Sequence, residues 1–132
     1  MYKIDVEFLK GDKFEPFLLK KIKLDVLVSN PPYVENEEDI DPLVKNNEPM
    51  TAVYSQDGTA FYEAYFRRHK SFMNKEKFLM AFEINYDQEI KLTKLIKKYF
   101  RNENVKFKFV KDIYGLTRYL FITKGYENEI IL

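Results

Sequence analysis

The sequence contains no cysteine and a single histidine, His69. The absence of cysteine excludes disulfides and thiolate metal sites, and one histidine argues against a metal centre built on imidazole ligands. We therefore expect no metal site, and a chain without cysteine is compatible with the cytoplasmic localisation that we predict. Glycine is also scarce, and its four residues are scattered singly at positions 11, 58, 115 and 125. A doubly wound nucleotide-binding fold normally begins with a strand, a glycine-rich turn and a helix, and no such turn is present here.

Neither strong net charge nor a long apolar run is present. The 22 basic and 21 acidic side chains leave a net charge of +1, which predicts no strong attraction to nucleic acid. No segment approaches the roughly 18 apolar residues of a membrane span, and the first residues lack the apolar core of a signal peptide. We expect no membrane association, and contact with nucleic acid only indirectly if at all. With 45% apolar residues, we expect one domain spanning residues 1–132.

Strand-like and helix-like apolar patterns alternate along the chain, which is typical of an α/β sheet. We predict a long loop over residues 34–57, with at most a short helix at 39–45. The helix beginning at Thr59 carries an aromatic stripe that we expect to be buried. The predicted strands are 4–9, 24–29, 78–84, 105–110 and 119–124, and the predicted helices are 59–73 and 87–101.

The most informative segment is the turn Asn30, Pro31, Pro32 and Tyr33, which follows the predicted strand 24–29. Each proline fixes its own φ, lacks a backbone N–H and holds the preceding residue in extended geometry. The carbonyls of Asn30 and Pro31 are therefore fixed hydrogen-bond acceptors. A planar NH2 group, from a carboxamide or a base, would donate to the Asn30 side-chain oxygen and the Pro31 carbonyl while lying against Tyr33.

Such a turn suits methyl transfer to a nitrogen whose lone pair is delocalised. Catalysis then consists of alignment and of acceptors that favour the more positive nitrogen of the transition state. We predict that Asn30, Pro31 and Tyr33 are catalytic, and that all four turn residues bind the acceptor group. The alternatives are an ordinary strand-ending turn for Asn30 and simple packing for Tyr33.

Several segments together resemble the HemK/PrmC-type S-adenosylmethionine-dependent methyltransferases, which modify the glutamine side-chain amide of translation release factors. Besides the turn, the similarity covers residues 11–16, 47–49, 56–62, 83–88 and 111–118, in order and at family-like spacing. Asn-Pro-Pro-Tyr by itself also resembles the motif of methyltransferases that act on adenine or cytosine amino groups. The flanking segments favour the protein-glutamine enzymes.

The resemblance implies a partial Rossmann-like methyltransferase sheet of α/β class, with a terminal antiparallel strand pair and without the glycine-rich first βαβ unit. It implies S-adenosylmethionine as cofactor, contacted by Asp12, Phe14 and Asn30. It also places Glu48 and Pro49 near the glutamine and makes a peptide chain release factor the protein partner. The chain resembles only the C-terminal half of the catalytic domain, so we expect a fragment or a truncated gene product in which half of the cofactor site is missing.

In the family's sheet, the strand matching 4–9 is separated from the one matching 24–29 by two strands that this chain lacks. Strand 24–29 would therefore have an open edge, which seeks another strand. We expect strand 4–9 to pair with it, or two chains to form a homo-oligomer through this edge, or a separate partner to supply the missing half.

Two other functional classes remain open: a truncated relic or binding module without catalysis, and a nucleic-acid amino-methyltransferase. The second would carry a target-recognition region or a basic cleft, and neither is evident in the sequence. Among single residues, we expect Glu83 and Gln88 to be structural and His69 to be an exposed polar residue of its helix.

Overall fold

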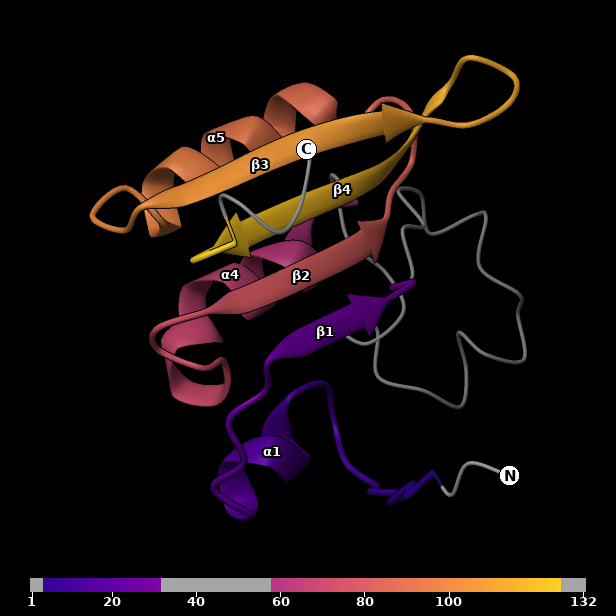
Figure 1. The fold of residues 1–132 in the computed structure, drawn as a ribbon. Helices are drawn as coiled ribbons and strands as arrows, with labels where there is room; N and C mark the ends of the chain where they lie inside the picture. The colour runs from indigo at the N-terminus through magenta and orange to yellow at the C-terminus, as the bar shows by residue number, and fades with distance from the viewer. Residues whose placement is uncertain (1–3, 32–57, 127–132) are drawn as a thin grey trace.

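The computed structural model describes residues 4–31 and 58–126. Four strands form one mixed sheet in the order β1-β2-β4-β3 (Figure 1). β1 runs parallel to β2, while β4 is antiparallel to both β2 and β3. The α/β class and the terminal antiparallel pair are thus confirmed. The strands are β1 (Val26–Ser29), β2 (Phe78–Glu83), β3 (Val105–Lys111) and β4 (Thr117–Lys124).

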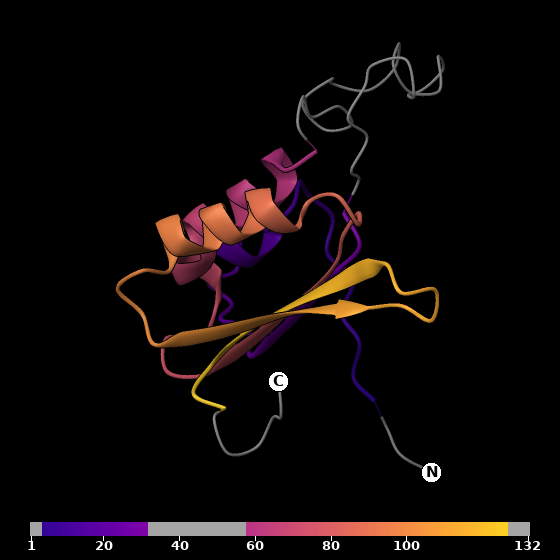
Figure 2. The ribbon, with the colours of Figure 1, turned by 90° about the horizontal axis from the view of Figure 1, so that it is seen from above.

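The three helices of the described residues lie on one face of this sheet (Figure 2). They are α1 (Glu15–Leu19), α4 (Ala60–Phe72) and α5 (Glu89–Tyr99). The two longer helices match the predicted ones to within two residues at each end. Every second residue of β2 is buried beneath them, as strand geometry requires. The predicted aromatic stripe of α4 supplies much of the core, through Tyr62, Tyr65, Phe66 and Phe72.

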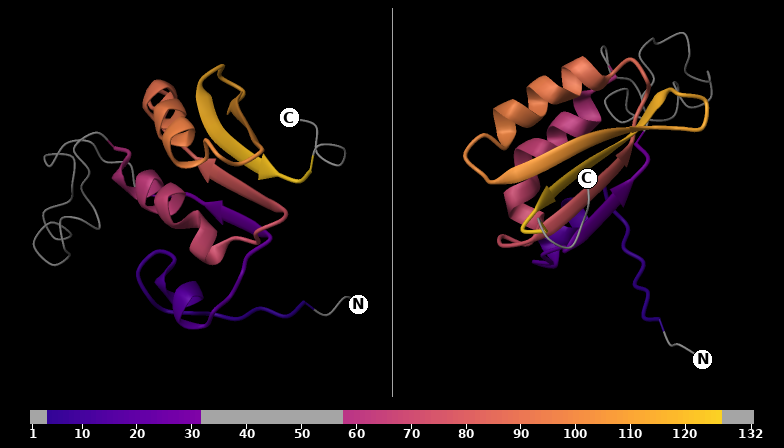
Figure 3. Two further views of the ribbon diagram at one scale, coloured as in Figure 1. Left: turned by 90° about the vertical axis from the view of Figure 1, so that its left-hand side faces the viewer. Right: turned by 45° about the horizontal axis from the view of Figure 1, so that its top comes forward.

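The opposite face of the sheet is covered by no helix of the described residues (Figure 3). Residues in register across it include Val28 on β1, Ala81 on β2 and Phe121 on β4. Val28 is 76% exposed. β1 pairs only with β2 within the described residues, so its other edge is open. This confirms the predicted open edge.

The predicted strand at residues 4–9 is wrong, and so is the first of the three alternatives for the open edge, in which this strand pairs with β1. Residues 4–10 form no strand or helix. The apolar side chains of Ile4, Val6 and Phe8 are 82%, 65% and 91% exposed. A strand requires a hydrogen-bonded neighbour, and alternation alone cannot provide one.

Two smaller differences concern the segment before β1. The helix α1 was not predicted, although Pro16 in its first turn is well placed to begin a helix. The predicted strand 24–29 begins two residues later, at Val26, while Leu24 forms an isolated parallel bridge with Met73. The predicted loop 34–57 and its short helix at 39–45 lie outside the described residues. No helix in the described part of the chain has the length and apolar character needed to cross a membrane.

Candidate functional site

Asn30 and Pro31 lie directly after the carboxyl end of β1. Asn30 is exposed and Pro31 is buried. Because Ser29 is in register with Phe82 of β2, Asn30 lies next to the end of β2, where open α/β sheets commonly bind ligands. The structure therefore presents the side-chain amide of Asn30 to solvent on an anchored backbone. The other predicted substrate-binding residues lie outside the described part of the chain: Pro32, Tyr33, Glu48 and Pro49.

A buried amide fixes the chain around this end of the sheet. The Gln88 side chain has no exposed surface, and its Nε2 donates to the carbonyl of Gly58 over 2.7 Å. Its Oε1 accepts from the backbone N–H of Asn85 at 2.9 Å. Gln88 thus connects the turn after β2 to the segment that leads into α4, which confirms its predicted structural role.

The carboxyl end of β2 is held by α4 as well. The hydroxyl of Tyr62 donates to the carbonyl of Glu83, the last residue of β2, over 2.9 Å. The Tyr62 ring also meets that of Phe82 edge-on, with 5.7 Å between centroids. Both contacts position the sheet end that adjoins Asn30.

The predicted cofactor residues Asp12 and Phe14 lie in and next to the turn before α1. Phe14 stacks on Phe72 of α4, with 4.9 Å between centroids and 12° between planes, and meets Tyr65 edge-on at 5.3 Å. Asp12 has 70% of its side chain exposed and lies 3.6 Å from the ammonium of Lys13. Phe14 is thus packed against α4, while the carboxylate of Asp12 remains accessible.

The electrostatic effect of Asp12 reaches the core. Burial, together with the negative charge of Asp12, raises the pKa of the Tyr65 hydroxyl to about 12. Asp12 and Phe14 belong to the segment before α1, whereas Asn30 and Pro31 belong to the end of β1.

The chain is similar in sequence to a group of known proteins that share one name. Over 117 residues the chain is 37% identical to the release factor glutamine methyltransferase of Bacillus subtilis, a match that covers 86% of this chain and 40% of the relative. The enzyme of the same name from Fusobacterium nucleatum is 32% identical over 128 residues, covering 95% and 35%. This chain is homologous to part of the release factor glutamine methyltransferases. It spans about 40% of the length of the first of these curated relatives, and no protein-family model matches it.

The fold agrees with this homology. The crystal structure of a release-factor-specific protein-(glutamine-N5) methyltransferase from Alicyclobacillus acidocaldarius superposes with a TM-score of 0.57. The alignment covers 82% of this chain and 53% of the other at 18% sequence identity. At that identity the match concerns the fold alone.

The structure also explains the segment Lys111–Arg118, which resembles a methyltransferase motif. Asp112 accepts hydrogen bonds through Oδ1 from the backbone N–H groups of Tyr114 and Leu116, at 2.9 and 3.1 Å. Its Oδ2 lies 3.4 Å from Nε of Arg118, and Gly115 adopts φ +80° in the turn. The motif therefore shapes the turn between β3 and β4.

The ionisation of Asp112 depends on these contacts. Desolvation acts to raise the pKa of the carboxyl, but the backbone N–H groups of Leu116 and Tyr114 and the guanidinium of Arg118 outweigh it. The net result is a lowered pKa for Asp112.

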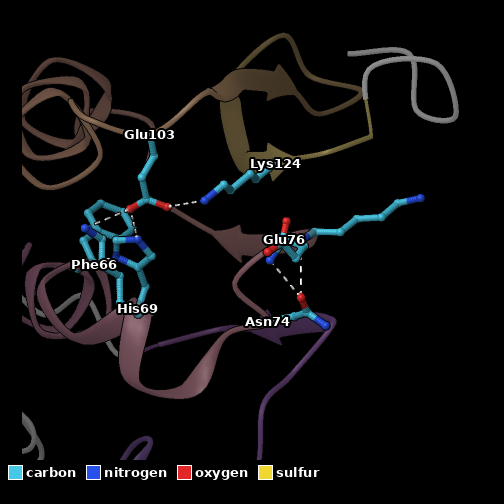
Figure 4. Close-up of polar contacts among 8 residues, drawn as sticks. Phe66, His69, Asn74, Glu76, Glu103 and Lys124 are labelled. Carbon is cyan, nitrogen blue, oxygen red and sulfur yellow. Dashed lines mark hydrogen bonds and ion pairs between the residues drawn. The ribbon is translucent and has the colours of Figure 1, made fainter.

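The prediction that His69 is exposed is wrong. The residue is 2% exposed and lies between Phe66 and Glu103 (Figure 4). Its Nε2 pairs with the Glu103 carboxylate, which also lies 3.3 Å from Nζ of Lys124. Helical spacing was the missed signal, since His69 comes seven residues after Tyr62 and three after Phe66, on the buried face.

The residues predicted to contact S-adenosylmethionine agree with that role in part. Asp12 and Asn30 each present an accessible polar side chain. The oxygen atoms of these side chains can accept hydrogen bonds from amino groups of the cofactor. Phe14 has one ring face stacked on Phe72, so only the rest of its ring can contact a ligand.

Proposed function

We propose that this chain carries the acceptor-binding part of an S-adenosylmethionine-dependent methyltransferase site of the HemK/PrmC type. The substrate is the side-chain amide of a glutamine in a peptide chain release factor. One observation carries the proposal: the exposed amide of Asn30 and the anchored Pro31 lie at the carboxyl end of β1, in a chain homologous to release factor glutamine methyltransferases. The sheet is then the C-terminal portion of a Rossmann-like methyltransferase domain.

The mechanism assigns alignment and charge stabilisation to this chain. The side-chain oxygen of Asn30 and the carbonyl of Pro31 each accept a hydrogen bond from the glutamine NH2 group. S-adenosylmethionine, when bound, supplies an electrophilic methyl group. As the glutamine nitrogen becomes more positive, the two acceptors bind its hydrogens more strongly, which lowers the barrier. The new C–N bond replaces the bond between the methyl group and the sulfonium sulfur, and one of the two hydrogens is released as a proton to solvent water.

The remaining predicted residues complete the proposed site. Tyr33 stacks on the glutamine amide, and Pro32 keeps the turn rigid. Glu48 and Pro49 contact the release factor close to the glutamine. On the cofactor side, Asp12 accepts a hydrogen bond from the adenine amino group, and the accessible part of Phe14 lines the adenine pocket.

The open edge of β1 supports a further part of the proposal. Since β1 has one strand neighbour in the described residues, we propose that a further strand pairs along this edge in the active assembly, from a second copy or from other residues of the methyltransferase domain. This pairing would stabilise the backbone on which Asn30 is positioned.

Calorimetry with S-adenosylmethionine and S-adenosylhomocysteine tests the proposal first. The expected result is the mass of one added methyl group on the glutamine-bearing peptide of a release factor. The chain itself should produce it if it binds either compound at micromolar concentration, and otherwise a longer polypeptide that includes the chain should produce it. If the chain binds neither compound and a longer polypeptide that includes it methylates no glutamine, the proposal is wrong and a non-catalytic binding role is favoured.

A further inference from the structure

A cavity lies at the end of the sheet opposite Asn30. Its volume is about 550 Å³, within the range of small-molecule sites. It opens beside Phe78, where β2 begins, and Lys124, where the antiparallel β4 ends. Because β1 and β2 run from this end towards Asn30, the cavity is separate from the proposed methyltransferase site. The carboxyl end of α4 and the loops before β2 and β3 complete its wall.

The cavity concentrates positive charge. Four lysines line it against a single carboxylate, that of Glu103, which leaves a formal charge of +3 with His69 neutral. The whole chain has a net charge of only +1, so the rest of the molecule is slightly acidic. A concave surface of one sign focuses the electrostatic potential on its interior. The four lysines are Lys23, Lys70, Lys75 and Lys124.

The negative groups of the cavity are already bound. Glu103 is 8% exposed and is held by His69 and Lys124. The carbonyls of Lys70 and Ser71, at the carboxyl end of α4, accept hydrogen bonds from Nζ of Lys23 at 3.3 and 2.8 Å. Lys23 therefore offsets the partial negative charge of the helix terminus, so that end of α4 does not repel an anion.

Two lysines remain available to a ligand. The Lys70 side chain is 70% exposed, and its Nζ lies 4.0 Å from Glu103. Lys75 is exposed, and no ion pair or hydrogen bond is found for it in the part of the chain that the structure describes. The buried side chains of Met73 and Phe78 also line the cavity.

We propose that this cavity binds a soluble small molecule carrying a diphosphate group. Lys70 and Lys75 contact the phosphate oxygens directly, since ammonium groups bind phosphate as point charges. Asn102, which also lines the cavity, supplies a neutral amide donor. The excess of three positive charges matches a diphosphate better than a carboxylate or a single phosphate. This site is independent of methyl transfer.

Calorimetric titration of the full chain with pyrophosphate tests the proposal. We expect saturable binding at one site, and amide-resonance changes confined to residues around the cavity, in segments 70–75 and 102–103. Replacing both available lysines, K70Q/K75Q, should weaken binding about 25-fold, since each charge contributes about fivefold. The matched control, K94Q/K97Q, removes two exposed lysines of α5 and should weaken binding less than about twofold.

Several outcomes would overturn the proposal. Absence of saturable binding to the unmodified chain, resonance changes at the Asn30 end of the sheet, or equal weakening by the two double variants would each do so. Inorganic phosphate binding as tightly as pyrophosphate would contradict the diphosphate assignment. Tighter binding of a single-stranded oligonucleotide, lost in K70Q/K75Q, would replace the small molecule with a nucleic-acid backbone.

Discussion

The Nε2 of Gln88 donates a hydrogen bond to the carbonyl of Gly58 over 2.7 Å, between residues 30 positions apart. This contact joins the turn after β2 to the start of α4, close to the end of the sheet where Asn30 is exposed. A single buried amide thus holds together two of the connections that surround the proposed acceptor site.

Replacing Gln88 by alanine should therefore destabilise the fold. The substitution leaves the Gly58 carbonyl and the Asn85 N–H without their partner, at a cost of about 2 kcal/mol in the free energy of unfolding. Urea denaturation of the chain measures this. Asn102→Ala, which removes an exposed amide, is the matched control and should change the midpoint little. An unchanged midpoint for Gln88→Ala would contradict the structural role.

The buried ring of His69 contacts two groups that lie on either side of it. Its Nδ1 lies 2.5 Å from the carbonyl oxygen of Phe66, and its Nε2 pairs with the Glu103 carboxylate.

Truncation of Glu103 tests the same pair energetically. Glu103→Ala leaves the buried ring of His69 without its partner and should cost about 2 kcal/mol of stability. Glu103→Gln retains hydrogen-bonding capacity at the ring and should cost less. Glu76→Ala at an exposed site serves as the control. Equal losses in the three variants, measured by urea denaturation, would show that the His69 contact contributes nothing.

The lowered pKa of Asp112 predicts that its contribution to stability depends on pH. The pKa of Asp112 is lower in the folded chain than its ordinary value of 3.8. The ionised carboxylate therefore stabilises the fold at a pH above 3.8. The contribution is lost as the pH falls through the folded pKa. Asp112→Asn should lower the melting temperature at neutral pH and have little effect well below pH 3.8. Asp5→Asn, in the exposed N-terminal segment, should have no effect at either pH.

Two glycines with the same backbone conformation should differ in their response to alanine. Gly115 and Gly125 have φ +80° and +79°, so each substitution imposes strain of about 1 kcal/mol. A Cβ at Gly115 meets nothing within 4 Å, whereas one at Gly125 would lie 2.8 Å from the Glu76 carbonyl oxygen. Gly125→Ala should therefore lower the melting temperature more than Gly115→Ala, and the reverse order would contradict the packing around Gly125.

For the proposed methyl transfer, Asn30→Ala should reduce kcat far more than it changes the affinity for S-adenosylmethionine, because it removes an acceptor used in the transition state. Tyr33→Ala should instead raise the KM for the release factor. Asn104→Ala, at an exposed position between α5 and β3, is the control for Asn30. Steady-state kinetics in the assay of release factor methylation separates the two effects. Full activity of Asn30→Ala would exclude its proposed role.

The sequence by itself determined the elements whose patterns are local and strong. The aromatic spacing of α4 and the apolar face of α5, which includes Leu92 and Ile96, predicted both helices and their buried sides. The ordered motifs also predicted the homology to release factor glutamine methyltransferases. These predictions succeeded because helical periodicity and motif order are properties of the chain itself.

Only the tertiary structure decided what depends on partners distant in sequence. Residues 4–9 have a strand-like pattern, yet no strand in the described part of the chain pairs with them. His69 is polar, yet it is buried because Glu103, 34 residues away, satisfies its ring. Strand pairing and the burial of a polar group both require a hydrogen-bond partner, and a local pattern cannot reveal whether the fold supplies one.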